Sequence, residues 1–244
     1  MPQTLIPTLH HLSHSGSFRC LWALEELKQA NGIEYKLKCY SRQRGAAPPE
    51  LKAVSSLGKS PILTLESTTD QPVPTIQVFP GVLTEALLIL RFLSDEYGNG
   101  LWDVASEDKG RDIFFQSFAV MTLSVRVDHL VIIETLIHVL PFGLGSVIGL
   151  MATPLLSHFK NGLQPIFQIL NDALTDEKPW FSGGKFGLAD FNVSFGMDMA
   201  LQRGYFDPGK FPRLHAWHEI VKSRPGYLSA LELGNGYDLK TFGM

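Results

Sequence analysis

The sequence has little cysteine, little net charge and no block of basic residues, and each scarcity excludes a class of protein. Only two cysteines, Cys20 and Cys39, occur among 244 residues. They are too few for a disulfide framework and lack metal-ligand spacing, so we expect a reducing, cytoplasmic environment. The net charge is −3, and no basic stripe is present. Nucleic acid is therefore not expected as a partner.

A membrane span is also not expected. The start of the chain lacks the basic region and apolar core of a signal peptide. The segment 139–156 has no Asp, Glu, Lys or Arg, but it contains two prolines and three glycines. It barely reaches the roughly 18–20 residues that a spanning helix needs. We expect a helix–turn–helix there, either buried or facing a second copy of the chain.

The first hundred residues alternate strand-like and helix-like segments. Strands are predicted over 5–12, 35–40, 62–66 and 76–79, and helices over 18–31 and 85–97. A βαβ unit followed by a β-hairpin and a helix is typical of a thioredoxin-like domain. Gly98-Asn99-Gly100 ends the last helix, and the sequence after Ser106 is helical in pattern. We therefore predict an α/β domain over 1–98 followed by an all-α domain over 106–244.

A small polar loop, Ser13-His14-Ser15-Gly16-Ser17, separates the first strand from the first helix. A helix N-terminus offers N–H donors and partial positive charge, which favour a bound anion. A hydroxyl of Ser15 or Ser17 there can stabilise a thiolate, and lowering a thiol pKa by two units takes about 2.7 kcal/mol. The alternative is that both serines only cap the helix.

Two further segments are candidates for binding a charged ligand. Gly58-Lys59-Ser60 imitates the end of a phosphate-binding loop, but position 53 is Ala and Pro61 prevents the helix that such a loop needs. Thr84-Glu85-Ala86 leads directly into a helix. An acid at that place can pair with a ligand ammonium while the helix N-terminus receives a carboxylate.

In this order, the three segments resemble the glutathione site of cytosolic, serine-type glutathione transferases. Within that family, the chain as a whole most resembles fungal members. The resemblance places Ser15 at the catalytic serine position, with Ser17 as an alternative. His14 and Gly16 depart from the family motif, and Gly16 argues against the thiol-bearing, redox-active branch.

The resemblance also assigns glutathione contacts. Ser60, before a cis Pro61, would pair with the cysteinyl backbone, and Lys59 would meet the glycyl carboxylate. Glu85 would hold the γ-glutamyl ammonium. Ala86 replaces the usual serine, which predicts weaker binding. The alternative is that neither residue binds a ligand. Lys59 is then a solvated lysine in a loop, and Glu85 is an acidic residue in the first turn of a helix.

The C-terminal half carries a second segment that resembles a motif of this family. Residues 181–191 resemble the family's capping motif, which starts a buried helix. Gly187 stands where the family has Ser or Thr, and Phe186 and Phe191 are placed as a hydrophobic staple. Asp190 is accordingly interpreted as structural.

The implied activity is that of a glutathione transferase: the glutathione thiol is activated as a thiolate and attacks a hydrophobic electrophile, as in detoxification. A homodimer is implied, with glutathione as cosubstrate. No metal is expected, because neighbours such as His10 and His11 point to opposite faces of a strand. One alternative is a glutathione-dependent cis–trans isomerase in fungal secondary metabolism. Another is a non-catalytic binding module with the same fold.

Overall fold

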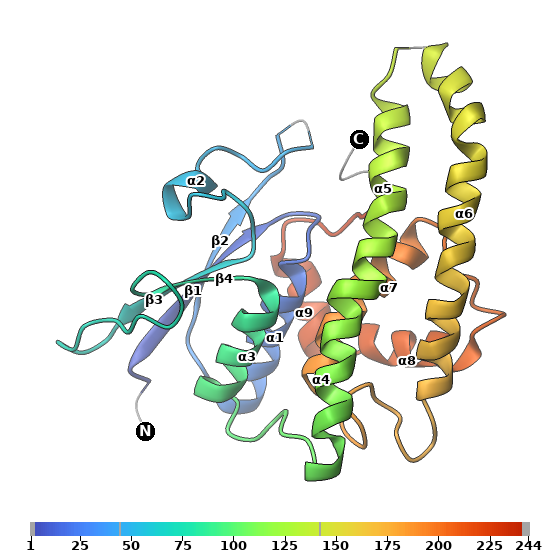
Figure 1. Cartoon of the computed structure of the whole chain (residues 1–244). Helices are drawn as coiled ribbons and strands as arrows, with labels where there is room; N and C mark the ends of the chain where they lie inside the picture. The colour runs from blue at the N-terminus through green and yellow to red at the C-terminus, as the bar shows by residue number, and fades with distance from the viewer. Residues whose placement is uncertain (1–2, 44, 142, 241–244) are drawn as a thin grey trace. The chain divides into compact units, whose positions relative to one another are not determined.

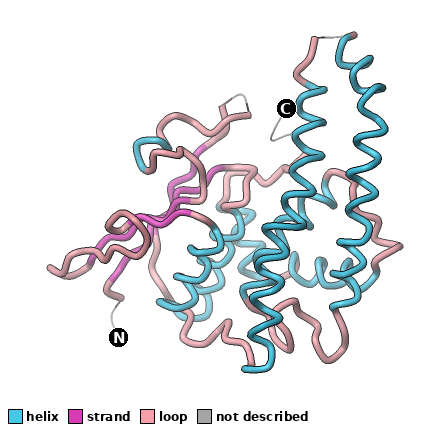
Figure 2. The backbone as a smooth tube through the Cα atoms, viewed as in Figure 1, coloured by secondary structure: helices cyan, strands magenta, loops and turns pink. Residues whose placement is uncertain are grey.

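The computed structural model describes residues 3–43, 45–141 and 143–240 (Figures 1 and 2). These residues form two compact units. The first comprises 3–103 together with 221–237, and the second comprises 104–220 together with 238–240. A C-terminal helix thus belongs to the N-terminal unit.

The first unit is built on a four-stranded mixed sheet in the order β2-β1-β3-β4. β1 pairs in parallel with β2 and antiparallel with β3, and β4 runs antiparallel to β3. The strands are β1 (Leu5–Leu12), β2 (Lys36–Tyr40), β3 (Ile62–Ser67) and β4 (Val82–Thr84). The thioredoxin-like prediction is confirmed.

The position predicted for the last strand is wrong. The sequence predicts it over 76–79, but β4 begins at Val82. Pro80 has no N–H to donate, and Gly81 takes a φ of 64° while its N–H donates to the carbonyl of Pro74. The chain therefore turns at these two residues, and only the segment beyond the turn can pair with β3.

Helices cover the sheet of the first unit. α1 (Phe18–Asn31), α3 (Ala86–Tyr97) and α9 (Pro225–Leu233) lie together, with α1 packed against both of the others (Figure 1). The short α2 (Leu51–Val54) contributes Leu51 to a cluster with Leu12 and Ile62.

The second unit is helical, as predicted. Its long green and yellow helices in Figure 1 are α5 and α6, which pack side by side. Its helical elements are η1 (Ser106–Asp108), α4 (Lys109–Phe118), the π-helical η2 (Ala119–Ser124), α5 (Val125–His138), α6 (Leu144–Ala173), α7 (Leu188–Gln202) and α8 (Pro212–Lys222).

The uncharged segment 139–156 forms the turn between α5 and α6 and the start of α6, apart from Phe142, which lies outside the described residues. The expected helix–turn–helix is present, but this segment is not buried within the chain. Leu150 is 77% exposed and Met151 76% exposed. No helix in the described part of the chain is both long and apolar enough to cross a membrane.

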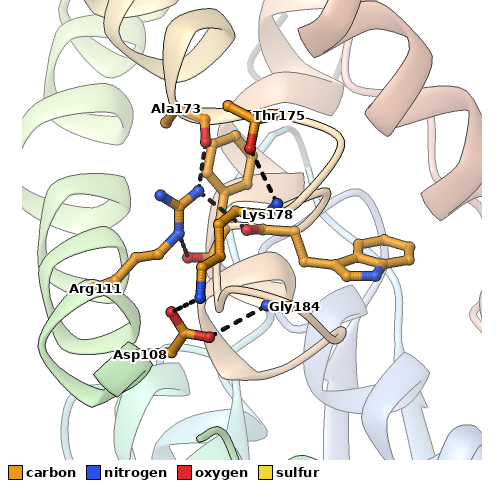
Figure 3. A network of polar contacts seen from close by, with 8 residues as sticks. Asp108, Arg111, Ala173, Thr175, Lys178 and Gly184 are labelled. Atoms are coloured by element: carbon orange, nitrogen blue, oxygen red, sulfur yellow. Dashed lines mark hydrogen bonds and ion pairs between the residues drawn. The ribbon is translucent and has the colours of Figure 1, made fainter. Parts of the chain in front are cut away.

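A polar network fastens the loop after α6 to the start of α4 (Figure 3). The Arg111 guanidinium donates to the carbonyls of Ala173, Trp180 and Phe181. The Asp108 carboxylate accepts from Lys178 Nζ at 2.7 Å and from the Gly184 N–H at 3.3 Å. These contacts hold the pKa of Asp108 below its usual value, chiefly through the hydrogen bond from Lys178.

The start of α7 is capped from elsewhere in the chain. Gly187 is the N-cap residue and has no side chain to offer. The N–H of Ala189 instead donates to Ser182 Oγ and to Asp112 Oδ1, both at 3.1 Å. The predicted staple is present, with the Phe186 and Phe191 rings 4.8 Å apart.

Asp190 has the structural surroundings that the sequence predicts. Its buried carboxylate accepts from the N–H groups of Phe181, Ser182 and Gly187 and from the indole of Trp217. Burial raises its pKa to about 6 against the opposite effect of these four donors.

Candidate active site

Strand register brings the three sequence segments to one edge of the sheet. His10 in β1 lies opposite Ile62 in β3, and Ile62 lies opposite Thr84 in β4. The loop after β1, the residues just before β3 and the residue just after β4 therefore share this edge. All of them belong to the first unit.

Ser15 and Ser17 both turn inward at this edge. Ser15 Oγ donates to the Leu12 carbonyl at 2.7 Å and lies 2.9 Å from Ser17 Oγ. Ser15 is 6% exposed, whereas Ser17 is fully buried. The Ser17 side chain makes no capping bond to α1. The capping alternative therefore fails for Ser17, and of the two hydroxyls only that of Ser15 has any access to solvent.

Behind Ser17 lies His11, which the sequence did not single out as functional. Its Nδ1 is 2.7 Å from Ser17 Oγ, and its Nε2 is 2.8 Å from the carbonyl oxygen of Gly234 at the end of α9. Burial lowers the pKa of His11 to about 4. Its contact with Gly234, 223 residues away, leaves no local signal in the sequence.

The residues just before β3 place their backbone at this same edge of the sheet. The Ser60–Pro61 peptide bond is cis, as the resemblance implies. Ser60 Oγ donates to the His10 carbonyl at 2.7 Å and accepts from the Leu12 N–H at 3.1 Å, so this hydroxyl ties the segment to β1. The side chain of Lys59 is exposed.

Glu85 occupies a strained position at the start of α3. It is exposed and has φ 64° and ψ 112°, a region that residues with a Cβ rarely adopt. Ala86, the first residue of the helix, is buried. The carboxylate of Glu85 and the N-terminus of α3 thus occupy the same edge as Ser15.

Arg42 is a further candidate that sequence reasoning missed. Its Nη2 donates to the carbonyl oxygen of His14 at 3.1 Å, and its Nη1 donates to that of Gly45. This contact puts a guanidinium beside the loop that carries Ser15. A lone arginine in a loop gives no signal before the fold is known.

The sheet edge lacks the features of a metal site. The described residues contain no group of three or more His, Cys, Asp and Glu side chains able to hold a metal ion. A cavity of about 700 Å³ in this unit lies elsewhere and is lined by Gln3, Thr4, Asn31, Thr68 and Tyr97 among others.

Comparison with known proteins shows which family this chain matches. Residues 15–96 match the family model described as "Glutathione S-transferase, N-terminal domain", and residues 157–225 match "Glutathione S-transferase, C-terminal domain". The chain belongs to the glutathione transferase superfamily.

Fungal glutathione transferases are among its relatives. It is 28% identical to glutathione S-transferase 3 of Schizosaccharomyces pombe over 230 residues, covering 92% of this chain and 86% of that protein. It is 24% identical to glutathione S-transferase 1 of Saccharomyces cerevisiae, covering 92% and 93%. A glutathione S-transferase structure from Actinobacillus pleuropneumoniae superposes with a TM-score of 0.70 at 25% identity, covering 97% and 95%.

The backbone conformation of Glu85 yields a prediction for this member of the superfamily. We expect Glu85→Gly to raise the free energy of unfolding by about 1 kcal/mol, because glycine adopts positive φ without strain. If Glu85 pairs with the γ-glutamyl ammonium, as the family resemblance implies, we expect the same variant to weaken glutathione binding by about 10-fold or more. Urea unfolding and calorimetric titration measure the two effects.

The matched variant Glu85→Gln separates strain from charge. It retains the strained backbone, so its stability is expected to equal that of the wild type while binding weakens. A Glu85→Gly protein that is less stable than the wild type would contradict the strain interpretation.

Proposed function

We propose that this protein is a glutathione transferase that activates the thiol of glutathione and directs it at a hydrophobic electrophile. The observation that carries the proposal is the convergence of Ser15, the Ser60–Pro61 segment and Glu85 at one sheet edge. The Ser15 hydroxyl stands there beside the N-terminus of α1.

Glutathione matches the chemistry of this edge group by group. The γ-glutamyl ammonium pairs with Glu85, and its carboxylate takes the N–H groups at the start of α3. The cysteinyl backbone pairs with the N–H and C=O of Ser60, and the glycyl carboxylate meets Lys59. Ala86 supplies a backbone N–H without a hydroxyl, which makes the affinity modest.

Ser15 stabilises the thiolate. A free thiol has a pKa of about 8.5, so only a few per cent is ionised at pH 7. A hydroxyl that turns from the Leu12 carbonyl to the sulfur, together with the field of α1, favours the anion by about 2–3 kcal/mol. The thiolate then forms a bond to an electrophilic carbon, and the electron pair of that carbon's broken bond leaves with its substituent.

We assign glutathione binding to residues 1–98 and the hydrophobic substrate to 106–244. Within the helical part, α4 and η2 carry apolar side chains that their own unit leaves uncovered: Phe114 is 51% exposed and Met121 72% exposed. A cytoplasmic homodimer is the proposed working form.

The test is ultraviolet difference absorbance of protein-bound glutathione, titrated with pH. A thiolate signal with an apparent pKa well below that of free glutathione is the expected result. Glutathione that binds without forming a thiolate would instead favour a non-catalytic binding module. Once a substrate is known, a reaction that consumes glutathione indicates conjugation. A reaction that requires glutathione without consuming it indicates cis–trans isomerisation.

A further inference from the structure

The residue before Ser15 has an uncommon backbone conformation. His14 has a φ of 53°, in the left-handed region that residues with a Cβ adopt infrequently. Among the residues that the structure describes, three others with a Cβ have a positive φ: Glu85, Asn99 and Asn235. A residue stays in this region only when its surroundings hold it there. The contacts of the His14 backbone therefore decide where the next residue, Ser15, lies.

Hydrogen bonds hold the peptide groups on both sides of the His14 Cα. The His14 N–H donates to the carbonyl oxygen of Gly236 at 3.1 Å. The His14 carbonyl oxygen accepts from Nη2 of Arg42, also at 3.1 Å. This carbonyl and the N–H of Ser15 belong to one rigid peptide plane. If His14 rotated to a negative φ, the two bonds could not both persist, and the plane that carries Ser15 would turn.

Arg42 is itself fixed by the segment that follows β2. Its side chain is half-buried, and its Nη1 donates to the carbonyl oxygen of Gly45 at 2.9 Å. Gln43 and Ala46 exchange two backbone hydrogen bonds, of 2.9 and 3.0 Å, in the same segment. Because the donors of a guanidinium lie in a fixed plane, one arginine can hold two carbonyl groups at once. Arg42 thus ties the segment after β2 to the loop after β1.

The other contact comes from the segment after α9. Gly236 has a φ of 102°, and a Cβ added there would lie 2.8 Å from Cε1 of the His14 ring. Glycine permits both this conformation and this close approach. The next residue, Tyr237, stacks on Phe18 at the start of α1, with ring centroids 3.9 Å apart. The stacking keeps the Gly236 carbonyl beside the Ser15 loop.

We propose that Arg42 and the backbone of Gly236 position the Ser15 hydroxyl for the thiolate by holding His14 at positive φ; this inference rests on the function proposed above. A hydroxyl stabilises a thiolate only at hydrogen-bond distance and in the right direction. A turn of the peptide plane between His14 and Ser15 changes both. Arg42 acts through the His14 backbone, so its role requires no contact with the sulfur.

The test measures the ionisation constant of protein-bound glutathione by thiolate absorbance, with each signal normalised to the glutathione bound. Arg42→Ala is expected to lower this constant by about 5-fold or more, because His14 is then free to leave the left-handed region. Normalisation keeps any loss of affinity or of folded protein out of the comparison. A constant within about 2-fold of the wild-type value would overturn the role of Arg42.

A glycine at position 14 separates positioning from charge. A direct effect of the Arg42 charge on the thiolate is the competing explanation. Arg42→Ala is therefore also made together with His14→Gly, because glycine adopts a positive φ without being held. Positioning predicts that Arg42→Ala then costs about 2-fold or less. Equal losses with and without His14→Gly would assign the effect to charge and overturn the inference, as would a His14→Gly protein that forms no thiolate.

Gly236→Ala tests the other hydrogen bond without removing a charge. It is expected to lower the ionisation constant by about 5-fold, because the carbonyl of residue 236 moves away from the His14 N–H. The matched control is Gly32→Ala. Gly32 also has a positive φ, 68°, but a Cβ there meets no heavy atom within 4 Å. The control should keep the wild-type constant, and equal losses in both variants would overturn the role of Gly236.

Failure of the inference and failure of the proposed function give different results. A wild type that binds glutathione without forming a thiolate removes the proposed function, and the inference with it. A wild-type thiolate that persists unchanged in Arg42→Ala and Gly236→Ala removes the inference alone. Should Arg42→Ala bind no glutathione, the comparison of Gly236→Ala with Gly32→Ala decides.

Discussion

Asp190→Ala is expected to lower the free energy of unfolding by about 4 kcal/mol, the largest stability effect that we predict for a single substitution. Four donors, three backbone N–H groups and the indole of Trp217, would lose their acceptor inside the protein. Asp190 is fully buried, so water cannot replace the carboxylate. Urea unfolding followed by circular dichroism measures the loss, and a loss below about 1 kcal/mol would contradict it.

The variant Asp190→Asn retains one acceptor oxygen and is expected to lose about half as much. Its difference from the wild type should also depend on pH. The pKa of Asp190 is about 6 in the folded protein and about 3.9 in an unfolded chain. A raised acid contributes stability that is lost as pH rises through the folded pKa. The wild-type advantage should therefore be about 1.4 kcal/mol larger at pH 5 than at pH 7.5.

Ser15→Ala is expected to reduce kcat/KM for conjugation by about 100-fold, because the thiolate pKa rises by about two units. Glutathione affinity should change little, since in the proposed binding mode Glu85, Lys59 and the Ser60 backbone hold the rest of the molecule. Steady-state kinetics and calorimetric binding separate the two quantities.

Ser13→Ala is the matched control for this experiment. Ser13 lies in the same loop and is also buried, and its backbone N–H donates to Tyr40. The control should retain wild-type turnover. Equal losses in both variants would show that the loop, rather than the Ser15 hydroxyl, was damaged.

The sequence predicted the elements of the sheet edge because their signals are local. The loop around Ser15, the proline before β3 and the acid before α3 each stand where a strand meets a turn or a helix. Their convergence follows from the βαβ and hairpin pattern. The shift of the last strand to Val82 was not predicted, because apolar residues at 76–79 look like a strand until Pro80 and Gly81 are seen to form the turn.

The groups behind this edge could not be predicted for a different reason. The His11 ring contacts the carbonyl of Gly234, and the Arg42 guanidinium donates to the carbonyl of His14. Asp112 and Ser182 likewise cap α7 from other elements. Each of these contacts exists only after distant segments pack, so residue types and spacings within one segment carry no trace of them.

The capping of α7 has a consequence for how the chain folds. The N–H of Ala189 donates to two acceptors, Ser182 Oγ seven residues earlier and a carboxylate oxygen of Asp112 77 residues earlier. The first turn of α7 therefore gains its full set of acceptors only when this distant carboxylate is in place, and closing so long a loop is slow. We expect α7 to dock after α4 has formed. A fragment beginning after Asp112 would contain most of the helices and still lack one of the two acceptors of the Ala189 N–H at the start of α7.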